Sequence, residues 1–165
     1  MLRKLKKDGL AWYEFSLFDR CPELAHGVFT RAGGVSGPEG QDLNLAFNEL
    51  DPPENVMINL RRAEAALGLS PAAFARQTHG LNILVVRPGD GYRPAAPAEV
   101  RQDYDAVIAP EPGVSLLVKL ADCQGIMLYD QTRRMLGLVH SGWRGSARNI
   151  IGAAAAKMKE LGART

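Results

Sequence analysis

The sequence predicts an α+β fold in a single domain. Its 165 residues are 46% hydrophobic and 23% charged, which is typical of one globular domain with a sizeable core. Short apolar runs bounded by glycine, proline and polar residues indicate strands. Two longer runs with apolar residues three or four positions apart indicate amphipathic helices. The chain is therefore expected to combine strands and helices around one core.

Charge and cysteine content exclude several classes of protein. Twenty basic and 18 acidic residues give a net charge of +2, which is too balanced to favour a nucleic-acid or membrane partner. The basic cluster within residues 1–7 is expected to be a solvated terminus. No run of about 18 apolar residues and no export signal is present. With only two cysteines, read as reduced thiols, the protein is expected to be cytoplasmic.

The first third of the chain contains two predicted strands and a helix. The strands cover residues 12–18 and 26–30, and a glycine-rich loop follows at 31–41. The helix begins at Asp51, which is expected to cap it, and ends at Gly68. Its predicted inner face consists of four apolar residues: Val56, Leu60, Ala63 and Leu67. A short helical turn is expected from Ser70.

The rest of the chain reads as strands followed by a helix. Residues 81–86 and 105–109 are predicted strands, separated by a proline-containing excursion over 88–104. Residues 113–130 and 133–140 are expected to pair through a turn and to lie in the middle of a sheet. The final helix is predicted from Ser146 to Leu161, ended by Gly162. Its predicted inner face is Ile150, Ile151, Ala154, Met158 and Leu161.

His79, Cys123 and His140 all fall at the ends of predicted strands. Histidine and cysteine titrate closest to neutral pH, so together they suit either a metal ion or a thiolate nucleophile with its base. Three ligands from separate strand ends are typical of a catalytic zinc site, which keeps a fourth position for water. The alternative is that Cys123 fills the core and the histidines are ordinary polar residues. Asp122 is either an orienting group or a turn aspartate.

The segment HSGWRGSARN, residues 140–149, combines a strand end, glycines, an arginine and a helix start. Backbone N–H groups and the Arg144 guanidinium are suited to an anion such as phosphate. The alternative is a tight turn with a solvated arginine and Trp143 packed on the sheet. Arg31, before two glycines, is a second and weaker candidate. His26 and Cys21 are expected not to be ligands.

The motifs HGVFTRAGGVS, DLNLAF, RQTHG, YDAVIA, ADCQGIML and HSGWRG together resemble the laccase-domain family. This family is also called polyphenol-oxidase-like, peptidoglycan editing factor or purine nucleoside phosphorylase. The resemblance implies layered mixed β-sheets flanked by helices. It implies that His79, Cys123 and His140 form a zinc-binding catalytic centre. It also implies phosphorolysis of adenosine, inosine and methylthioadenosine, and deamination of adenosine.

Other features of the resemblance qualify these expectations. Arg31 and Arg144 as substrate contacts are our own inference. Many relatives have alanine at the position of Ser141 and proline at the position of Gly125. The loop over residues 88–103 looks longer than is usual in the family. Relatives continue for roughly half this length again, so we expect residues 1–165 to be one domain that lacks the C-terminal part of the family, a difference larger than a typical supersecondary unit. The expected partners are a purine nucleoside and phosphate, with the oligomeric state left open.

Three other functions compete with this interpretation. A multicopper oxidase needs more imidazoles than three histidines supply, although copper can occupy a Cys-His-His site adventitiously. A cysteine hydrolase or amidase that edits peptidoglycan precursors would use Cys123 as nucleophile and His140 as base. A metal-binding module without catalysis is the third alternative.

Overall fold

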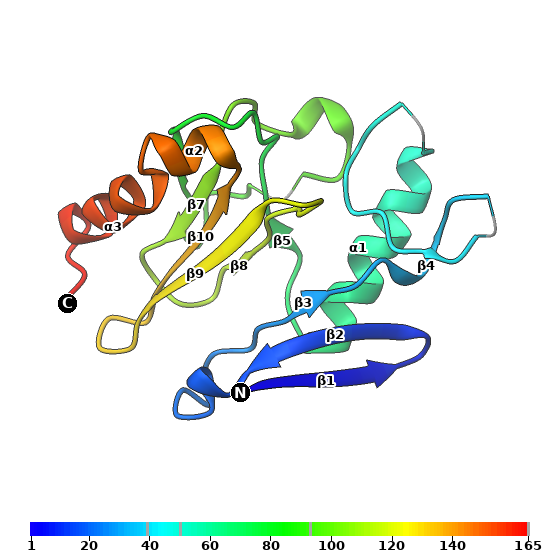
Figure 1. The fold of residues 1–165 in the computed structure, drawn as a ribbon, viewed down its shortest axis with the longest axis horizontal. Coiled ribbons are helices and arrows are strands. Elements are labelled where there is room, and N and C mark those ends of the chain that lie inside the picture. The colour runs from blue at the N-terminus through cyan, green and yellow to red at the C-terminus, as the bar shows by residue number, and fades with distance from the viewer. Residues whose placement is uncertain (39, 50, 93, 165) are drawn as a thin grey trace. The chain divides into compact units, whose positions relative to one another are not determined.

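The computed structural model describes residues 1–38, 40–49, 51–92 and 94–164. In these ranges, strands arranged in three sheets and three α-helices confirm the α+β class. The chain forms two compact units, Met1–Pro71 and Ala72–Thr165 (Figure 1). That the whole chain acts as one domain stays a prediction. Within the described ranges, no helix is long and apolar enough to cross a membrane.

The first unit begins with an antiparallel sheet. Its strands are β1 (Leu2–Lys7), β2 (Leu10–Phe15) and β3 (Val28–Phe29), in the order β1-β2-β3. The basic start of the chain is exposed, as expected, but its backbone pairs with β2 from Leu2 opposite Phe15 to Lys7 opposite Leu10. The predicted 12–18 strand was too long, because a 3-10 turn, η1 (Ser16–Phe18), follows β2.

The glycine-rich segment contains β4 (Ala32–Ser36), so the prediction of a loop throughout 31–41 was wrong. Its glycines have a structural reason. A Cβ on Gly33, which has φ of 91°, would overlap the carbonyl oxygen of Gly9. A Cβ on Gly34 would overlap the backbone of Asp42. These two positions therefore need glycine to let neighbouring backbones approach.

The helix α1 (Pro53–Leu67) confirms the predicted element and its end at Gly68, which adopts the left-handed conformation. Val56, Leu60 and Ala63 are buried, as predicted, and Leu67 is half-buried. The predicted Asp51 cap is wrong, because Pro52 precedes the helix and no side chain caps it. The Asp51 carboxylate instead accepts hydrogen bonds from three polar side chains: Ser36 (2.5 Å), Asn44 (2.8 Å) and Asn55 (3.1 Å).

The second unit contains a four-stranded mixed sheet in the order β6-β7-β10-β9. Its strands are β6 (Ile83–Val85), β7 (Ala106–Ala109), β9 (Gln124–Asp130) and β10 (Met135–Ser141). β6 and β7 are parallel, and the other pairs are antiparallel. The central position of β10 confirms the prediction, whereas β9 ends this order and was wrongly expected in the middle.

The second unit also contains two further strands and a short 3-10 turn. β5 (Ala72–Ala73) and β8 (Ser115–Leu116) form a separate parallel pair. β5 lies where a helical turn was expected from Ser70, so that prediction was wrong. The proline-containing excursion carries one 3-10 turn, η2 (Pro97–Glu99).

The final helix is divided in two. α2 (Trp143–Ala147) and α3 (Ile150–Glu160) are separated at Asn149, whose φ of 58° is left-handed. Its side chain accepts the Gly152 N–H at 3.0 Å and so caps α3. The prediction of one continuous helix was therefore wrong. Three of the predicted inner residues are buried, Ile150, Ala154 and Met158, whereas Ile151 is 36% exposed.

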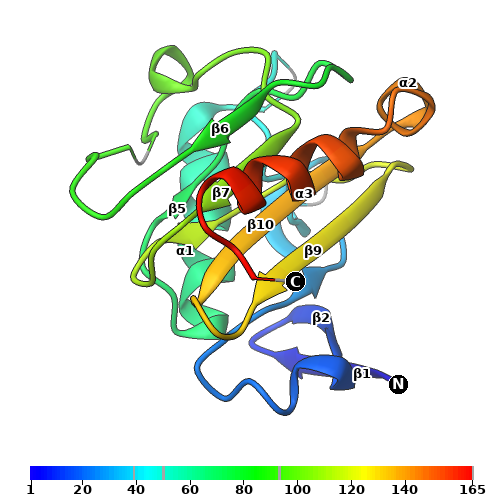
Figure 2. The same cartoon turned by 90° about the vertical axis from the view of Figure 1, so that its left-hand side faces the viewer.

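Alternation along β10 decides which side chains reach the site. Met135 and Val139 pack in clusters with residues of α3, which covers this face of the sheet (Figure 2). Leu136 and Leu138 pack against the cluster on the opposite face. Because side chains alternate along a strand, His140 belongs to that opposite face.

Candidate metal centre

The second unit brings His79, Cys123 and His140 together. One donor atom from each residue, an imidazole nitrogen or the thiol sulfur, lies within 4.8 Å of the other two. His79 lies between β5 and β6, Cys123 directly precedes β9, and His140 is the penultimate residue of β10. Residues 44 and 17 positions apart in the sequence thus share one site, as predicted. Their metal-binding and catalytic roles stay predictions.

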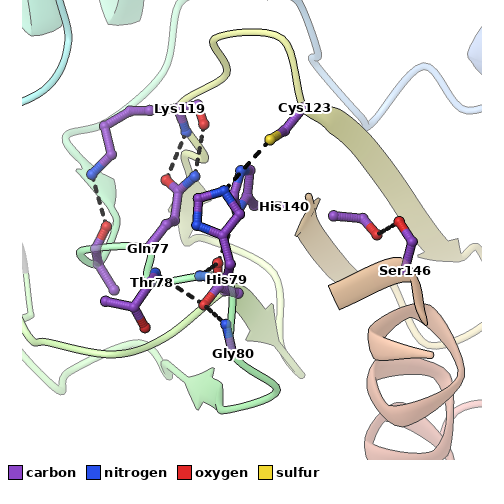
Figure 3. Close-up of polar contacts among 11 residues, drawn as sticks. Gln77, Thr78, His79, Gly80, Lys119, Cys123, His140 and Ser146 are labelled. Atoms are coloured by element: carbon purple, nitrogen blue, oxygen red, sulfur yellow. Dashed lines mark hydrogen bonds and ion pairs between the residues drawn. The ribbon is translucent and has the colours of Figure 1, made fainter. Parts of the chain in front are cut away.

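The His79 side chain contacts both of the others (Figure 3). The Cys123 Sγ lies 3.6 Å from Nε2 of His79. The two imidazole rings meet edge to face, with centroids 5.0 Å apart and planes at 73°. His140 is only 4% exposed, whereas the other two residues are half-buried. The site therefore has one inner candidate ligand, His140, and two candidate ligands nearer to solvent.

Asp105, which sequence reasoning missed, organises the inner side of the site. Its buried carboxylate accepts the backbone N–H groups of Thr78 (3.1 Å), His79 (2.9 Å) and Gly80 (2.7 Å). The same carboxylate lies 2.8 Å from Nδ1 of His140. Burial raises the pKa of Asp105, but the hydrogen bonds from His140 and these amides outweigh burial and leave the pKa below its usual value.

The bond to Asp105 also selects the tautomer of His140. A carboxylate only accepts hydrogen bonds, so Nδ1 of His140 carries a proton, and in the neutral imidazole Nε2 then keeps its lone pair. The backbones reinforce this pairing, because the His140 N–H donates to the Asp105 carbonyl at 2.7 Å. The sequence signal was present, since Asp105 is the acidic residue at the start of the buried β7 run. Only the cross-strand register of β7 and β10 reveals its partner.

The structure favours one of the two interpretations of Asp122. It is exposed and has a left-handed φ of 77°, which fits the alternative of a turn aspartate.

Gly142 packs directly against two of the three candidate ligands. A Cβ at this position would overlap Cδ2 of His79, and would lie 2.9 Å from its Nε2 and 3.2 Å from Sγ of Cys123. The φ of Gly142 is −73°, so the requirement for glycine comes from space and not from backbone conformation. The chain after His140 thus closes against the site at its first turn.

Arg144 and Trp143 lie on α2, immediately after this turn. Trp143 is 72% exposed, so the alternative in which it packs on the sheet is wrong. The Arg144 guanidinium carbon lies 4.6 Å from the Trp143 ring centroid, in a cation–π arrangement. The turn itself is held by a hydrogen bond of 2.8 Å between the hydroxyls of Ser141 and Ser146.

The remaining sequence candidates belong to the first unit. Arg31 forms a bidentate ion pair with Asp42, at 3.1 and 2.6 Å, beside a cavity of about 640 Å³. Its role as a substrate contact stays a prediction. His26 accepts the Phe15 N–H at Nε2 (2.8 Å), and Cys21 is a buried free thiol. Both lie outside the group of three candidate ligands, and the expectation that neither binds a metal stays a prediction.

Relatives with experimentally determined structures share this fold. A hypothetical protein YfiH from Bacillus licheniformis matches with a TM-score of 0.78 and 27% identity, over 97% of this chain and 57% of that one. YlmD from Geobacillus stearothermophilus matches with a TM-score of 0.75 and 28% identity, over 90% of this chain and 55% of that one.

Relatives in sequence carry an enzyme name. A purine nucleoside phosphorylase of Deinococcus radiodurans is 36% identical over 149 residues, which cover 88% of this chain and 54% of that protein. Purine nucleoside phosphorylase ORF3 of Streptomyces griseus is 37% identical over 142 residues, which cover 84% and 56%. The chain thus spans about half the length of these relatives. A family model described as multi-copper polyphenol oxidoreductase laccase matches residues 25–165, and the chain belongs to this family.

Proposed function

We propose that this chain carries the zinc centre of a purine nucleoside phosphorylase. The observation that supports the proposal most directly is the convergence of His79, Cys123 and His140 within 4.8 Å. Relatives that are 36% and 37% identical bear the same enzyme name. We extend the proposal to phosphorolysis of adenosine, inosine and methylthioadenosine, and to deamination of adenosine. The expected location is the cytoplasm.

The donor set fits zinc. Two imidazole nitrogens and one thiolate are ligands that zinc prefers, and three protein ligands leave a fourth position for water or substrate. Asp105 fits the same purpose, since histidine ligands of zinc commonly donate their second N–H to a carboxylate. Copper also binds such ligands and is an adventitious competitor. When bound, zinc would supply a Lewis acid that lowers the pKa of water and so promotes attack on the purine carbon that bears the amine.

The protein groups around this centre have separable tasks. Asp105 keeps the His140 proton on Nδ1 and directs Nε2 to the site. The same carboxylate fixes the backbone of Thr78, His79 and Gly80, and so positions the backbone from which the His79 side chain extends. Gly142 removes the free space beside the His79 ring. Together these contacts prearrange the ligands before any metal or substrate arrives.

Arg144 is our candidate for holding phosphate against the ribose. It follows Gly142 by two residues, so it lies close in the chain to the turn that packs on the ligands. A guanidinium offers paired donors that match phosphate oxygens and stabilise negative charge. Trp143 supports the guanidinium from one side through the cation–π contact. Arg31 is a second proposed contact, although its present partner is Asp42.

The central experiment is incubation with adenosine, with and without phosphate, followed by identification of the products and of the bound metal. Adenine with ribose phosphate indicates phosphorolysis, and inosine indicates deamination. Cys123→Ala is expected to abolish both zinc binding and turnover while the protein stays folded. Cys21→Ala is the matched control, because it removes the other thiol from a buried position in the first unit. Wild-type turnover by Cys123→Ala would refute the proposal.

A cysteine hydrolase is the second candidate, favoured by the contact of 3.6 Å between Cys123 and His79. The imidazole in contact with the thiol is thus His79, whereas His140 was expected as the base. Activity that survives complete removal of zinc would support this candidate over the phosphorylase. Bound zinc without any turnover, in folded protein, would support a metal-binding module.

A further inference from the structure

Two segments run from the small β5/β8 pair to the metal centre. Residues 72–79 end at His79, and residues 115–123 end at Cys123. They begin as parallel neighbours, and the Leu117 N–H extends the pairing by donating to the Ala73 carbonyl at 3.0 Å. The separation of the two ligands therefore depends on what holds these segments together beyond the strands.

The side chain of Gln77 supplies the next connection (Figure 3). Its Nε2 donates to the Lys119 carbonyl at 2.7 Å, and its Oε1 accepts the Lys119 N–H at 3.0 Å. A carboxamide has a donor and an acceptor, so it satisfies both backbone groups of one residue, as a neighbouring strand would. Gln77 thus extends the backbone pairing toward the site by means of a side chain.

The side chain of Lys119 returns to the other segment. Its Nζ donates to the Ala75 carbonyl at 2.7 Å and lies 4.7 Å from the ring centroid of Phe74. Burial lowers the pKa of Lys119 to about 8. Both contacts are with residues 74–75, so this amine joins the two segments.

We infer that Gln77 and Lys119 are positioning residues that fix the distance between His79 and Cys123. We call their four contacts the Gln77–Lys119 clasp. Gln77 is two residues from His79, and Lys119 is four residues from Cys123, so slippage of one segment along the other would separate the two donor atoms. Zinc holds nitrogen and sulfur at about 2.0–2.3 Å, and a site displaced by about 1 Å loses this geometry. The inference rests on the proposed zinc function.

The test compares Gln77→Met with Gln131→Met. Both changes replace a carboxamide by a side chain of similar length, but Gln131 follows β9 at the end opposite Cys123. Zinc affinity is measured by competition with a chromophoric chelator, and cobalt is substituted to record the thiolate charge-transfer and d–d bands. We expect Gln77→Met to bind zinc about tenfold more weakly and to weaken the cobalt bands, at the low end of the loss seen for groups that support ligands. Gln131→Met should match the wild type.

Unchanged zinc affinity and cobalt bands in folded Gln77→Met would overturn the inference, even if its thermal stability falls. If the wild type itself binds no zinc, the proposed function fails. Amide hydrogen exchange of the metal-free protein then tests whether the clasp holds the two segments together. Faster exchange of the amides of residues 78–80 in Gln77→Met than in Gln131→Met supports the clasp, and equal exchange overturns it. If Gln77→Met does not fold, Lys119→Met is tested by the same measurements. This variant loses the contacts of Nζ but keeps both hydrogen bonds of Gln77, which are made to the Lys119 backbone.

Discussion

The Asp105 carboxylate and Nδ1 of His140 lie 2.8 Å apart, although 35 residues separate them in the sequence. Both side chains are almost fully buried, and a backbone hydrogen bond between the same two residues joins β7 to β10. One aspartate therefore sets the tautomer of one candidate ligand and the backbone of another. This arrangement leads to the first prediction.

Asp105→Asn should weaken zinc binding about 10- to 100-fold, because a carboxamide can present its N–H₂ to Nδ1 and favour the other imidazole tautomer. The protein should still fold, since the Asn oxygen can replace Oδ2 as the acceptor for the amides of Thr78 and Gly80, whereas the His79 amide, which bonds Oδ1, loses its acceptor. Chelator competition measures the affinity. Asp122→Asn is the matched control, an identical change at an exposed residue beside Cys123. Equal affinities for the two variants would contradict the role of Asp105.

Gly142→Ala should distort the site by steric overlap with the ring of His79. We expect a loss of about 1–3 kcal/mol in the free energy of unfolding, as for other overpacked sites, together with weaker zinc binding. Gly80→Ala provides the control, because its Cβ would make an ordinary contact of 3.5 Å with Asp105. Chemical denaturation and zinc titration of both variants measure the effects. Tolerance of alanine at Gly142 would show that His79 has room to move.

Arg144→Ala should raise the KM for phosphate about tenfold or more, the value expected for loss of a hydrogen bond to a charged group. Deamination of adenosine, which uses no phosphate, should change much less. Stability should stay within about 0.5 kcal/mol because the residue is exposed. Arg148→Ala, at the end of α2, tests whether loss of any nearby positive charge has the same effect. Equal losses in both reactions would instead indicate a structural role for Arg144.

Asp130 should make stability depend on pH in the acidic range. The backbone N–H of Arg164 donates to it at 2.5 Å, and those of Thr132 and Arg133 donate at 2.8 and 3.1 Å. The hydrogen bond from Arg164 is the largest cause that lowers the pKa of Asp130, and the other two amides lower it further. A lowered folded-state pKa stabilises the protein above the unfolded-state pKa of about 3.9, and this stabilisation is lost as the pH falls through the folded-state pKa.

Asp130→Asn tests this linkage. The variant should be less stable than the wild type at pH 7, and the difference should shrink below about pH 4. Denaturant midpoints measured from pH 7 to pH 2.5 give the comparison. Asp90→Asn is a control at an exposed aspartate that accepts a single backbone N–H, from Arg87. A difference between wild type and Asp130→Asn that is independent of pH would rule out the carboxylate as its source.

Much of the site was predictable because its residue types are rare in this chain. With three histidines and two cysteines in all, the placement of His79, Cys123 and His140 at strand ends was a recognisable pattern. Asp105 was not predicted, because aspartate is common and its role depends on the register between β7 and β10. That register joins residues far apart in the sequence, and local periodicity does not encode it.

The fold was predicted best where a local signal is strong. α1 has an amphipathic period and a terminal glycine, and both predicted its extent. The interruption of the final helix at a single residue was not predicted. Asn149 tolerates the left-handed conformation and caps the helix that follows. The two-residue strands β5 and β8 were also missed, since so short an element is defined by its partner and not by its own composition.

The left-handed residue Asn149 has a mechanical consequence. It ends the hydrogen-bonded ladder of one helix before the next begins, so the five residues of α2 are anchored to β10 through Gly142 and the Ser141–Ser146 hydroxyl pair. α3 is anchored separately, through its own buried side chains on the sheet. Arg144 and Trp143 are therefore carried on a one-turn helix whose position is set at the end of β10 and not by the longer helix α3.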